Sequence, residues 1–308
     1  MRKTEYFIHS TNGKSRLHVI EWQPEGEIRA ILQIAHGMAE YIDRYDRFAS
    51  DLADGGILVI GNDHLGHGQS AEDDDELGYF PGGGKSAVVV ADLYRITTQI
   101  RAKHPEAPFF LMGHSMGSFL ARRYIMEHGT GLSGAIIMGT GAQPPATLKA
   151  AKALAGTVGR LRGEHYRSPL LNNLAFGAYN KRIPDAATPF DWLSVNPENV
   201  KKYIADPHCG YVFTVNGFQT LFDVIGYIQE DAHIRKIPAD LPLLFVAGEE
   251  DPVGGYAKDV KAVASAYRKA GIKEIKEIYY KGCRHEILNE EAYPQVAADI
   301  RAFLEAHI

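Results

Sequence analysis

The chain has 308 residues, of which 45% are hydrophobic and 23% are charged, and its formal net charge is −5. These values are typical of a soluble globular protein, and the length allows one large α/β domain with an insertion or two small domains. No block of Lys and Arg suggests a nucleic-acid surface, and no run of about eighteen apolar residues predicts a membrane span. The N-terminal stretch MRKTEYFIHSTNG has no apolar core segment, so we expect no signal peptide and a cytoplasmic location. The two cysteines, Cys209 and Cys283, form no metal or disulfide framework.

Short apolar runs rich in β-branched residues alternate with helical patterns along most of the chain. A hairpin is predicted where 4–10 and 16–22 flank the turn residues Asn12 and Gly13. Strands that alternate with helices predict a mostly parallel sheet with helices on both faces. The further predicted strands are 30–37, 57–63, 109–113, 134–140, 243–247 and 275–280, and the predicted helices are 44–56, 85–103, 116–128, 256–270 and 288–306.

The alternation of strands and helices lapses between about 143 and 237. This segment combines short helical patterns with seven prolines, and such a pattern does not extend a sheet. We therefore expect an α/β domain formed by 1–142 and 238–308, with 143–237 as a helical insertion above one end of the sheet. The prolines are Pro144, Pro145, Pro169, Pro184, Pro189, Pro197 and Pro207.

A serine stands between two glycines at the junction of a predicted strand and a predicted helix, in the sequence GHSMG (113–117). A serine on a very tight turn at the carboxyl end of a strand has its hydroxyl lifted clear of the backbone. Such a turn crowds the backbone, so the positions two before and two after it must lack bulk. The helix that follows directs its N-terminal N–H groups toward the same place. The pattern predicts that Ser115 is a nucleophile on a nucleophile elbow.

A serine hydroxyl needs a base, and the base needs a carboxylate to fix its tautomer. In a sheet of this kind the chain order is Ser, acid, His, with each residue after a later strand. His285 follows the last predicted strand and is the candidate base. Asp251 is the favoured acid because Pro252 makes its loop rigid, although the neighbours Glu249 and Glu250 fit the pattern as well.

The negative oxygen that forms during ester cleavage needs two backbone N–H donors. One is the residue after the nucleophile, Met116, and the other comes from the loop after the third strand. His36 and Gly37 end that strand, which makes Met38 the predicted second donor.

Five stretches together resemble the monoacylglycerol lipase and lysophospholipase group of α/β-hydrolases, a serine aminopeptidase-type family. They are HGMAEYIDRY (36–45), DHLGHGQS (63–70), GHSMGS (113–118), GEEDPVG (248–254) and GCRHEILNE (282–290). The resemblance implies an eight-stranded sheet, a helical cap between the sixth and seventh strands, and no cofactor. It also implies that Ser115, Asp251 and His285 form a catalytic triad, with Met38 and Met116 as oxyanion donors.

Two positions depart from the family pattern. Tyr41 stands where many relatives have a histidine, and Ser118 stands where many have a glycine. Within DHLGHGQS, the side chains of Asp63, His64 and His67 have the chemistry of metal ligands. The resemblance instead makes them a buried loop network, so we expect no metal site.

These features predict a serine hydrolase that cleaves carboxylic esters through an acyl-enzyme, on monoacylglycerol or lysophospholipid-type single-chain substrates. Small esters, aryl (hydroxycinnamoyl) esters and peptide amides are alternative substrates, and a binding protein without catalysis is a further alternative that the intact triad disfavours. The partner is then a small-molecule or lipid ester, and the cap is the surface expected to meet lipid. The predicted substrate contacts are Phe176, Tyr179, Tyr211, Phe213, Phe218 and Val253.

Overall fold

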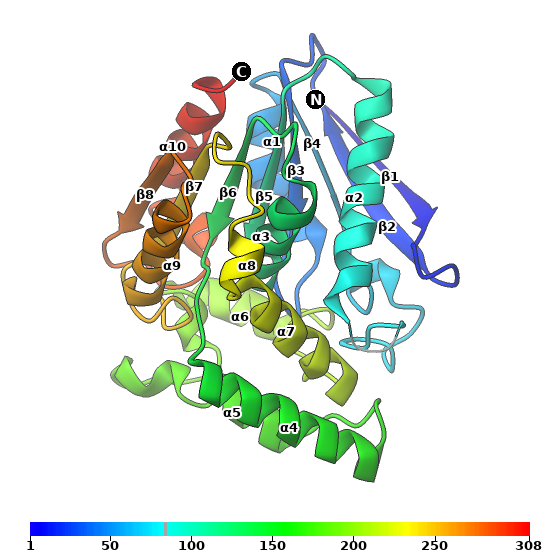
Figure 1. The fold of residues 1–308 in the computed structure, drawn as a ribbon, viewed down its shortest axis with the longest axis vertical. Helices are drawn as coiled ribbons and strands as arrows, with labels where there is room; N and C mark the ends of the chain where they lie inside the picture. The colour runs from blue at the N-terminus through cyan, green and yellow to red at the C-terminus, as the bar shows by residue number, and fades with distance from the viewer. Residues whose placement is uncertain (83–84) are drawn as a thin grey trace.

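An eight-stranded sheet forms the centre of the molecule, in the order β1-β2-β4-β3-β5-β6-β7-β8 (Figure 1). The computed structural model describes residues 1–82 and 85–308. The pairs β1–β2 and β2–β4 are antiparallel, and the other neighbouring pairs are parallel. The predicted fold class is therefore confirmed. The strands are β1 (Arg2–His9), β2 (Arg16–Gln23), β3 (Ala30–Ala35), β4 (Ile57–Asn62), β5 (Phe109–His114), β6 (Gly134–Met138), β7 (Leu243–Gly248) and β8 (Ile275–Tyr280).

The burial of the strands explains their sequences. Every residue of the five strands from β4 to β7 in the sheet order is buried, and these strands read as continuous apolar runs because helices cover both faces. The edge strands β1 and β8 are partly exposed and carry charged side chains, which suits strands with one unpaired edge.

Helices cover the two faces of the sheet unequally. On one face lie α1 (Asp46–Ala53) and α10 (Tyr293–Glu305), and on the other lie α2 (Ser86–Lys103), α3 (Met116–His128) and α9 (Lys258–Lys269) (Figure 1). A separate cluster of buried apolar side chains fills each layer.

Two predicted helices are shorter in the structure than their patterns suggest. The pattern over 44–56 divides into the 3-10 turn η1 (Ile42–Tyr45) and α1, and the chain leaves α1 through Gly56, whose φ of 85° suits glycine. The pattern over 288–306 begins as the 3-10 turn η5 (Ile287–Asn289), and α10 starts only at Tyr293, with proline in its first turn.

Between β6 and β7 the chain forms helices, 3-10 turns and one isolated β-bridge between Arg167 and Thr214, and in Figure 1 the helices α4 and α5 lie beyond the lower end of the sheet. Proline opens three of these helices, at the position where its missing N–H is not needed. The elements are α4 (Pro145–Arg162), α5 (Pro169–Phe176), η3 (Tyr179–Arg182), η4 (Asp191–Leu193), α6 (Pro197–Ala205), α7 (Val215–Ile228) and α8 (Asp231–Ile234).

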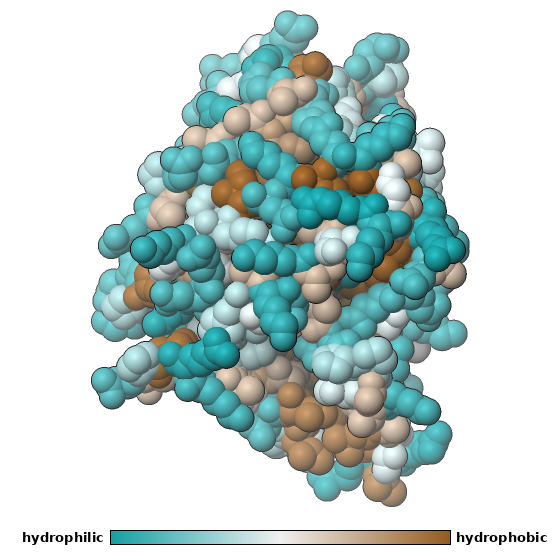
Figure 2. Space-filling view, turned by 60° about the vertical axis from the view of Figure 1, so that its left-hand side comes forward, coloured by the Kyte–Doolittle hydropathy of each residue, from teal (hydrophilic) through white to brown (hydrophobic). Residues whose placement is uncertain are grey.

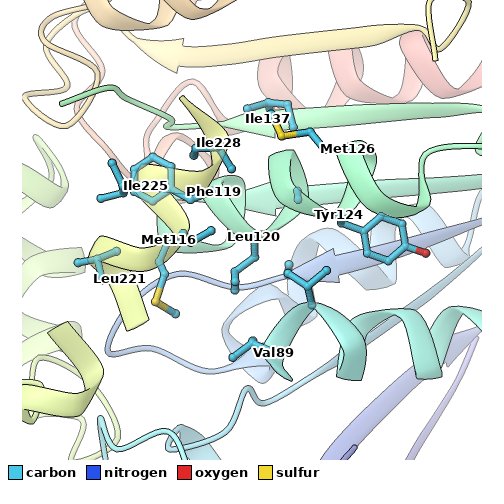
Figure 3. Close-up of a cluster of buried hydrophobic side chains, with 14 of the residues drawn as sticks. Val89, Met116, Phe119, Leu120, Tyr124, Met126, Ile137, Leu221, Ile225 and Ile228 are labelled. Carbon is cyan, nitrogen blue, oxygen red and sulfur yellow. The ribbon is translucent and has the colours of Figure 1, made fainter. Parts of the chain in front are cut away.

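Helix α7 joins this inserted segment to the layer over the sheet. Leu221, Ile225 and Ile228 extend from α7 toward the side chains of α3, among them Met116 and Phe119 (Figure 3). The same cluster continues into α2 and β6, so the insertion shares its core with the α/β domain. No helix in the part of the chain that the structure describes is long and apolar enough to cross a membrane.

Candidate active site

Ser115 lies between β5 and α3 in a backbone conformation that favours glycine. Its φ is 54° and its ψ is −122°. A residue with a side chain keeps a positive φ only where the surrounding structure enforces it, and such strain is concentrated at functional sites. The Ser115 N–H donates to the carbonyl oxygen of Met138 at 3.0 Å, which ties the turn to the end of β6.

Two glycines make this tight turn sterically possible. A Cβ atom at Gly113 would lie 2.1 Å from the carbonyl oxygen of Gly117, and a Cβ atom at Gly117 would lie 2.0 Å from the carbonyl oxygen of Ala35. Both neighbours are backbone atoms that cannot move aside without displacing a strand or helix. The crowding predicted from the sequence GHSMG is present, and it packs the start of α3 directly on the end of β3.

His285 and Asp251 meet at the same edge of the sheet. Asp251 follows β7 and His285 follows β8, and the distance between Asp251 Oδ2 and His285 Nδ1 is 2.9 Å. The carboxylate is fully buried, and its second oxygen accepts the N–H of Val253 at 2.8 Å. With Nδ1–H donated to the carboxylate, Nε2 is left as the acceptor nitrogen, and it has no hydrogen-bond partner within residues 1–82 and 85–308.

The structure also separates the three acidic residues of the Asp251 loop. Glu249 and Glu250 are exposed, whereas Asp251 is buried against the imidazole. Of the alternatives that the sequence left open, only Asp251 is brought to His285.

Met38 and Met116, the predicted oxyanion donors, line the same cavity as Ser115. Met116 is the first residue of α3, so its N–H is among those that a helix leaves without an internal acceptor. Neither N–H donates to an acceptor in the described part of the protein. The loop that carries Met38 is fixed on both sides, because the carboxylate of Glu40 accepts the Gly37 N–H at 2.6 Å and the Ala39 carbonyl accepts from the hydroxyl of Tyr203 at 2.9 Å.

A buried charge cluster, which we call the Arg44 cluster, lies beneath this loop, and sequence reasoning did not identify it. Its members are Glu40, Arg44, Tyr45, His114 and Glu286. Arg44 donates to Glu40 at 2.6 Å and to both carboxylate oxygens of Glu286 at 2.8 and 2.9 Å. His114 Nδ1 lies 3.2 Å from Glu40 Oε1, and the hydroxyl of Tyr45 donates to the same oxygen at 2.9 Å. The i, i+4 spacing of Glu40 and Arg44 was visible in HGMAEYIDRY, but the partner Glu286 is 242 residues from Arg44.

The charges in this cluster shift one another's protonation. Burial alone would raise the pKa of Glu40, but the hydrogen bond with His114 and the charge of Arg44 outweigh it and hold the pKa well below its ordinary value. Burial likewise opposes ionisation of Glu286, and Arg44 again lowers the pKa. Burial would lower the pKa of His114, but its contact with Glu40 raises it. The cluster therefore favours ionised carboxylates around one guanidinium.

The loop DHLGHGQS (63–70) forms a second buried network beside the end of β3. Asp63 accepts from His18 at 2.9 Å and from the N–H of Ile42 at 2.8 Å. The rings of His36 and His64 are 4.0 Å apart, and burial lowers the pKa of His67 to about 3. Because these imidazoles are kept neutral and in mutual contact, the network supports the strand end from which Met38 emerges.

A cavity of about 540 Å³ opens onto Ser115 and His285. Four of the six predicted substrate contacts line it: Phe176, Tyr179, Tyr211 and Val253. The other two, Phe213 and Phe218, are fully buried in the core beneath the start of α7, where Phe213 packs edge-on against Phe80. The structure does not bring these two rings to the cavity, because the chain turns them inward as α7 begins.

Sequence reasoning missed much of the cavity wall. Apolar side chains of α3, α4 and α7 line one part of it: Phe119, Leu148, Ala151, Leu221, Phe222 and Ile225. The apolar stretch 146–159, which contains Leu148 and Ala151, was predicted to suit an acyl chain, but these two residues were not named as contacts. The second part of the wall is aromatic and mixed with amides: it joins the predicted contacts Phe176 and Tyr179 with Phe190, Trp192, Tyr203 and Asn180.

The sheet order, the strained serine turn and the position of the insertion define an α/β-hydrolase fold. Residues 26–292 match the family model described as serine aminopeptidase, S33. The chain is 28% identical to monoacylglycerol lipase from Mycolicibacterium smegmatis over 97% of each chain. It is 30% identical to monoglyceride lipase from Rattus norvegicus over 75% of this chain and 68% of the relative.

Among solved structures, a highly thermostable carboxyl esterase from Bacillus coagulans in complex with glycerol matches with a TM-score of 0.93. The two sequences are 29% identical over 100% of this chain and 99% of that one. The chain belongs to the serine aminopeptidase S33 family of α/β-hydrolases. It is a serine ester hydrolase, and the resemblance to the monoacylglycerol lipase group is confirmed.

The Arg44 cluster makes stability depend on pH. Arg44→Met leaves two buried carboxylates without their cation, so we expect it to lower the free energy of unfolding by about 3–5 kcal/mol near neutral pH. Both carboxyl pKa values are lowered in the folded protein, so this stabilisation is present above the ordinary carboxyl pKa and is lost as the pH falls through the lowered values. The difference between the two proteins should therefore begin to shrink as the pH falls below the ordinary carboxyl pKa of 4.5 and should shrink further with more acid, as measured by urea unfolding at neutral pH and at about pH 3.

The matched control is Arg29→Met, which removes an exposed ion pair with Glu305. It should cost no more than about 1 kcal/mol at either pH. An Arg44→Met cost that equals the Arg29→Met cost, or that does not change with pH, would contradict the role given to the cluster.

Proposed function

We propose that Ser115 is the nucleophile of this hydrolase, that His285 is its general base and that Asp251 orients the base. The observation that carries the proposal is the arrangement at the cavity: a strained serine, a histidine whose Nδ1 is held by a buried carboxylate, and an Nε2 that is free to accept a proton. Each of these features has a cost to stability or a specific steric requirement, and together they suit acyl transfer.

The reaction then follows in two halves. Ser115 Oγ attacks the ester carbonyl carbon while His285 Nε2 takes the hydroxyl proton, and the alcohol leaves with that proton as the acyl-enzyme forms. Water enters, gives a proton to the same nitrogen and attacks the acyl carbon. The bond to Ser115 Oγ then breaks, Oγ takes the proton back from His285 Nε2, and the acid is released. Asp251 stabilises the imidazolium in both halves without taking a proton. The backbone N–H groups of Met38 and Met116 are the proposed donors to the oxyanion.

Replacing triad residues should remove activity without unfolding the protein. We expect Ser115→Ala to lower kcat for p-nitrophenyl butyrate by at least about a thousandfold, and Asp251→Asn to do the same, because the imidazole loses the partner that fixes its tautomer. Steady-state kinetics give kcat, and circular dichroism checks the fold.

The controls are Glu249→Gln and Glu250→Gln, which change exposed carboxylates of the same loop. Both should retain nearly full activity. A Ser115→Ala protein with a tenth of the normal rate would refute the nucleophile, and a crippled Glu250→Gln with an active Asp251→Asn would refute the acid.

We further propose that the substrates are single-chain esters of the monoacylglycerol or lysophospholipid type, and that 143–237 acts as the cap that binds them. The cavity volume of about 540 Å³ falls in the range of sites that enclose a small-molecule ligand. Its apolar part between α3, α4 and α7 suits one acyl chain. Its aromatic and amide part lies on the side of His285, where Trp192 contacts the imidazole, and suits the departing alcohol. The relatives that are named monoacylglycerol lipases, and the glycerol-bound esterase, support this assignment.

Bulk added to the apolar part should shorten the preferred acyl chain. Ala151 is buried on α4 and lines the cavity, so Ala151→Phe should move the maximum of kcat/KM toward shorter p-nitrophenyl esters. Each methylene that no longer fits loses about 0.8 kcal/mol of transfer free energy, or about fourfold in kcat/KM. The measurement is kcat/KM for esters from acetate to palmitate.

Ala153→Phe is the control, because Ala153 is exposed on the same helix. It should leave the chain-length profile unchanged. A wild-type profile that declines steadily from acetate, and that Ala151→Phe does not alter, would favour small or aryl esters over acyl lipids.

We also propose that α4 and α5 contact lipid surfaces. Leu161, Leu170 and Leu174 are 76%, 57% and 49% exposed, and Figure 2 shows apolar side chains gathered at the lower end of the molecule, where Figure 1 places these helices. Helix α4 also carries Lys149, Lys152, Arg160 and Arg162 and no acidic residue. Apolar and basic side chains on one helix suit the interface of a membrane that contains anionic lipids.

Removing the exposed leucines should weaken activity on lipid aggregates only. We expect Leu161→Ser combined with Leu170→Ser to lower the rate on monoacylglycerol in anionic vesicles by about tenfold, since apolar burial in the interface is lost. The rate on dissolved p-nitrophenyl butyrate should not change. Phe7→Ser is the control, because Phe7 is 45% exposed on the edge strand β1. Equal losses on both substrates, or an equal effect of Phe7→Ser, would contradict the lipid contact.

A further inference from the structure

The loop that carries His285 is bonded to one short piece of the inserted segment. We call residues 281–290 the histidine loop and residues 190–196, which include η4, the tryptophan segment. Arg284 donates to the carbonyl oxygens of Asp191 and Ser194 at 2.7 and 2.9 Å. The N–H of Glu286 donates to the carbonyl oxygen of Leu193 at 2.8 Å. The residues on both sides of His285 therefore hold the tryptophan segment.

Glu290 completes this attachment from the far end of the histidine loop. It is buried, and its carboxylate accepts from the hydroxyl of Ser194 at 3.0 Å and from the N–H of Val195 at 2.9 Å. The same carboxylate accepts the N–H of Arg284 at 3.1 Å, so it bonds both segments at once. A buried carboxylate with three donors is costly to leave unpaired, which makes the attachment a rigid feature rather than an incidental contact.

The attachment brings one large side chain against the imidazole. Trp192 is 8% exposed, and its ring centroid lies 5.1 Å from that of His285. The ring of His114, which precedes Ser115, lies 4.7 Å from the same imidazole. Trp192 is itself held in place, because its backbone N–H donates to Asn180 Oδ1 at 3.0 Å and its ring centroid lies 4.9 Å from that of Tyr179.

The imidazole needs this support for a physical reason. The hydrogen bond to Asp251 fixes one ring nitrogen, but a ring held at a single atom can still tilt about that bond. Nε2 has no protein partner that would limit such a tilt in the part of the chain that the structure describes. A flat side chain in van der Waals contact with the ring restricts it, and catalytic groups displaced by about 1 Å lose about a hundredfold in rate.

We propose that the tryptophan segment is a fixed part of the catalytic apparatus rather than a moving part of the cap, and that Trp192 is a positioning residue for His285. Arg284 and Glu290 hold the segment, and the segment holds the ring. Substrate access is then left to other parts of the insertion, such as α4 and α5. The inference rests on the proposed roles of Ser115 and His285.

The competing view, in which 190–196 is a lid that opens, predicts the opposite effect of releasing the segment. Glu290→Ala removes the acceptor that bonds both segments. If the segment positions His285, Glu290→Ala should lower kcat for p-nitrophenyl butyrate and p-nitrophenyl palmitate alike, by about tenfold to a hundredfold, with little change in KM. If the segment is a lid, the variant should be as active as the wild type or more active, above all on the palmitate ester. Glu291→Ala, at the exposed neighbouring position, is the control and should behave as the wild type.

The role of the ring itself is tested with two substitutions and a spectroscopic readout. Trp192→Ala should lower kcat as Glu290→Ala does, and Trp192→Phe, which keeps a flat ring, should recover most of the loss. In proton NMR spectra, the low-field resonance of the His285 Nδ1–H should weaken or vanish in Trp192→Ala and remain in Trp192→Phe. Thermal unfolding identifies any variant that has simply lost its fold. If Trp192→Ala is such a variant, the kcat and the Nδ1–H resonance of Trp192→Phe decide whether the ring positions His285.

A fluorophosphonate probe separates this inference from the proposed function. Absence of labelling at Ser115 in the wild type would refute the proposed function itself. Labelling of the wild type together with equal labelling rates in Trp192→Ala and Glu290→Ala would leave the triad standing and overturn the positioning role. We expect wild-type labelling at Ser115 and rates lower by about tenfold or more in both variants.

Discussion

The close backbone approach between the end of β3 and the start of α3 is the constraint on which the rest of the site depends. A Cβ atom at Gly117 would enter the carbonyl oxygen of Ala35, and a Cβ atom at Gly37 would lie 3.1 Å from the Cβ of Ser115. Because no side chain fits at Gly117 and one at Gly37 would crowd Ser115 and the carboxylate of Glu40, the loop after β3 passes directly beside the serine turn. Met38 of this loop and Met116 of the helix then line one cavity, and the neighbouring strands β7 and β8 bring Asp251 and His285 to the same edge.

Charged side chains connect the loops at this edge of the sheet. The Arg44 cluster joins the Met38 loop to the histidine loop through Glu40 and Glu286, and Glu290 joins the histidine loop to the insertion. Buried ion pairs contribute little net stability compared with apolar packing, but a broken one is costly. Their value here is geometric, since they fix loops that no strand or helix could place. The strained φ of Ser115 is maintained by the hydrogen bond from its N–H to the Met138 carbonyl and by the close backbone packing at Gly113 and Gly117.

The sequence predicted those features that depend on residues close together in the chain. Strands such as 109–113 were predicted correctly because a parallel strand buried on both faces must be apolar throughout. The glycines at 113 and 117 indicated the tight turn between strand and helix. The order of Ser115, Asp251 and His285 followed from the order of the strands.

The features that the sequence did not reveal depend on contacts between distant residues. The Arg44–Glu286 pair, the Glu290–Ser194 bond and the Trp192–His285 contact each join segments about a hundred or more residues apart. Phe213 and Phe218 were misjudged because aromatic composition does not say which way a ring points. The division into 1–142, 143–237 and 238–308 stays a prediction.

The most direct test of the account is a crystal structure of the protein after reaction with a short alkyl fluorophosphonate. The account predicts a phosphorus atom bonded to Ser115 Oγ, with the phosphoryl oxygen about 2.7–3.1 Å from the backbone nitrogens of both Met38 and Met116. The imidazole of His285 should remain bonded to Asp251. An adduct on another residue, or a phosphoryl oxygen that turns away from these two N–H groups, would contradict the account.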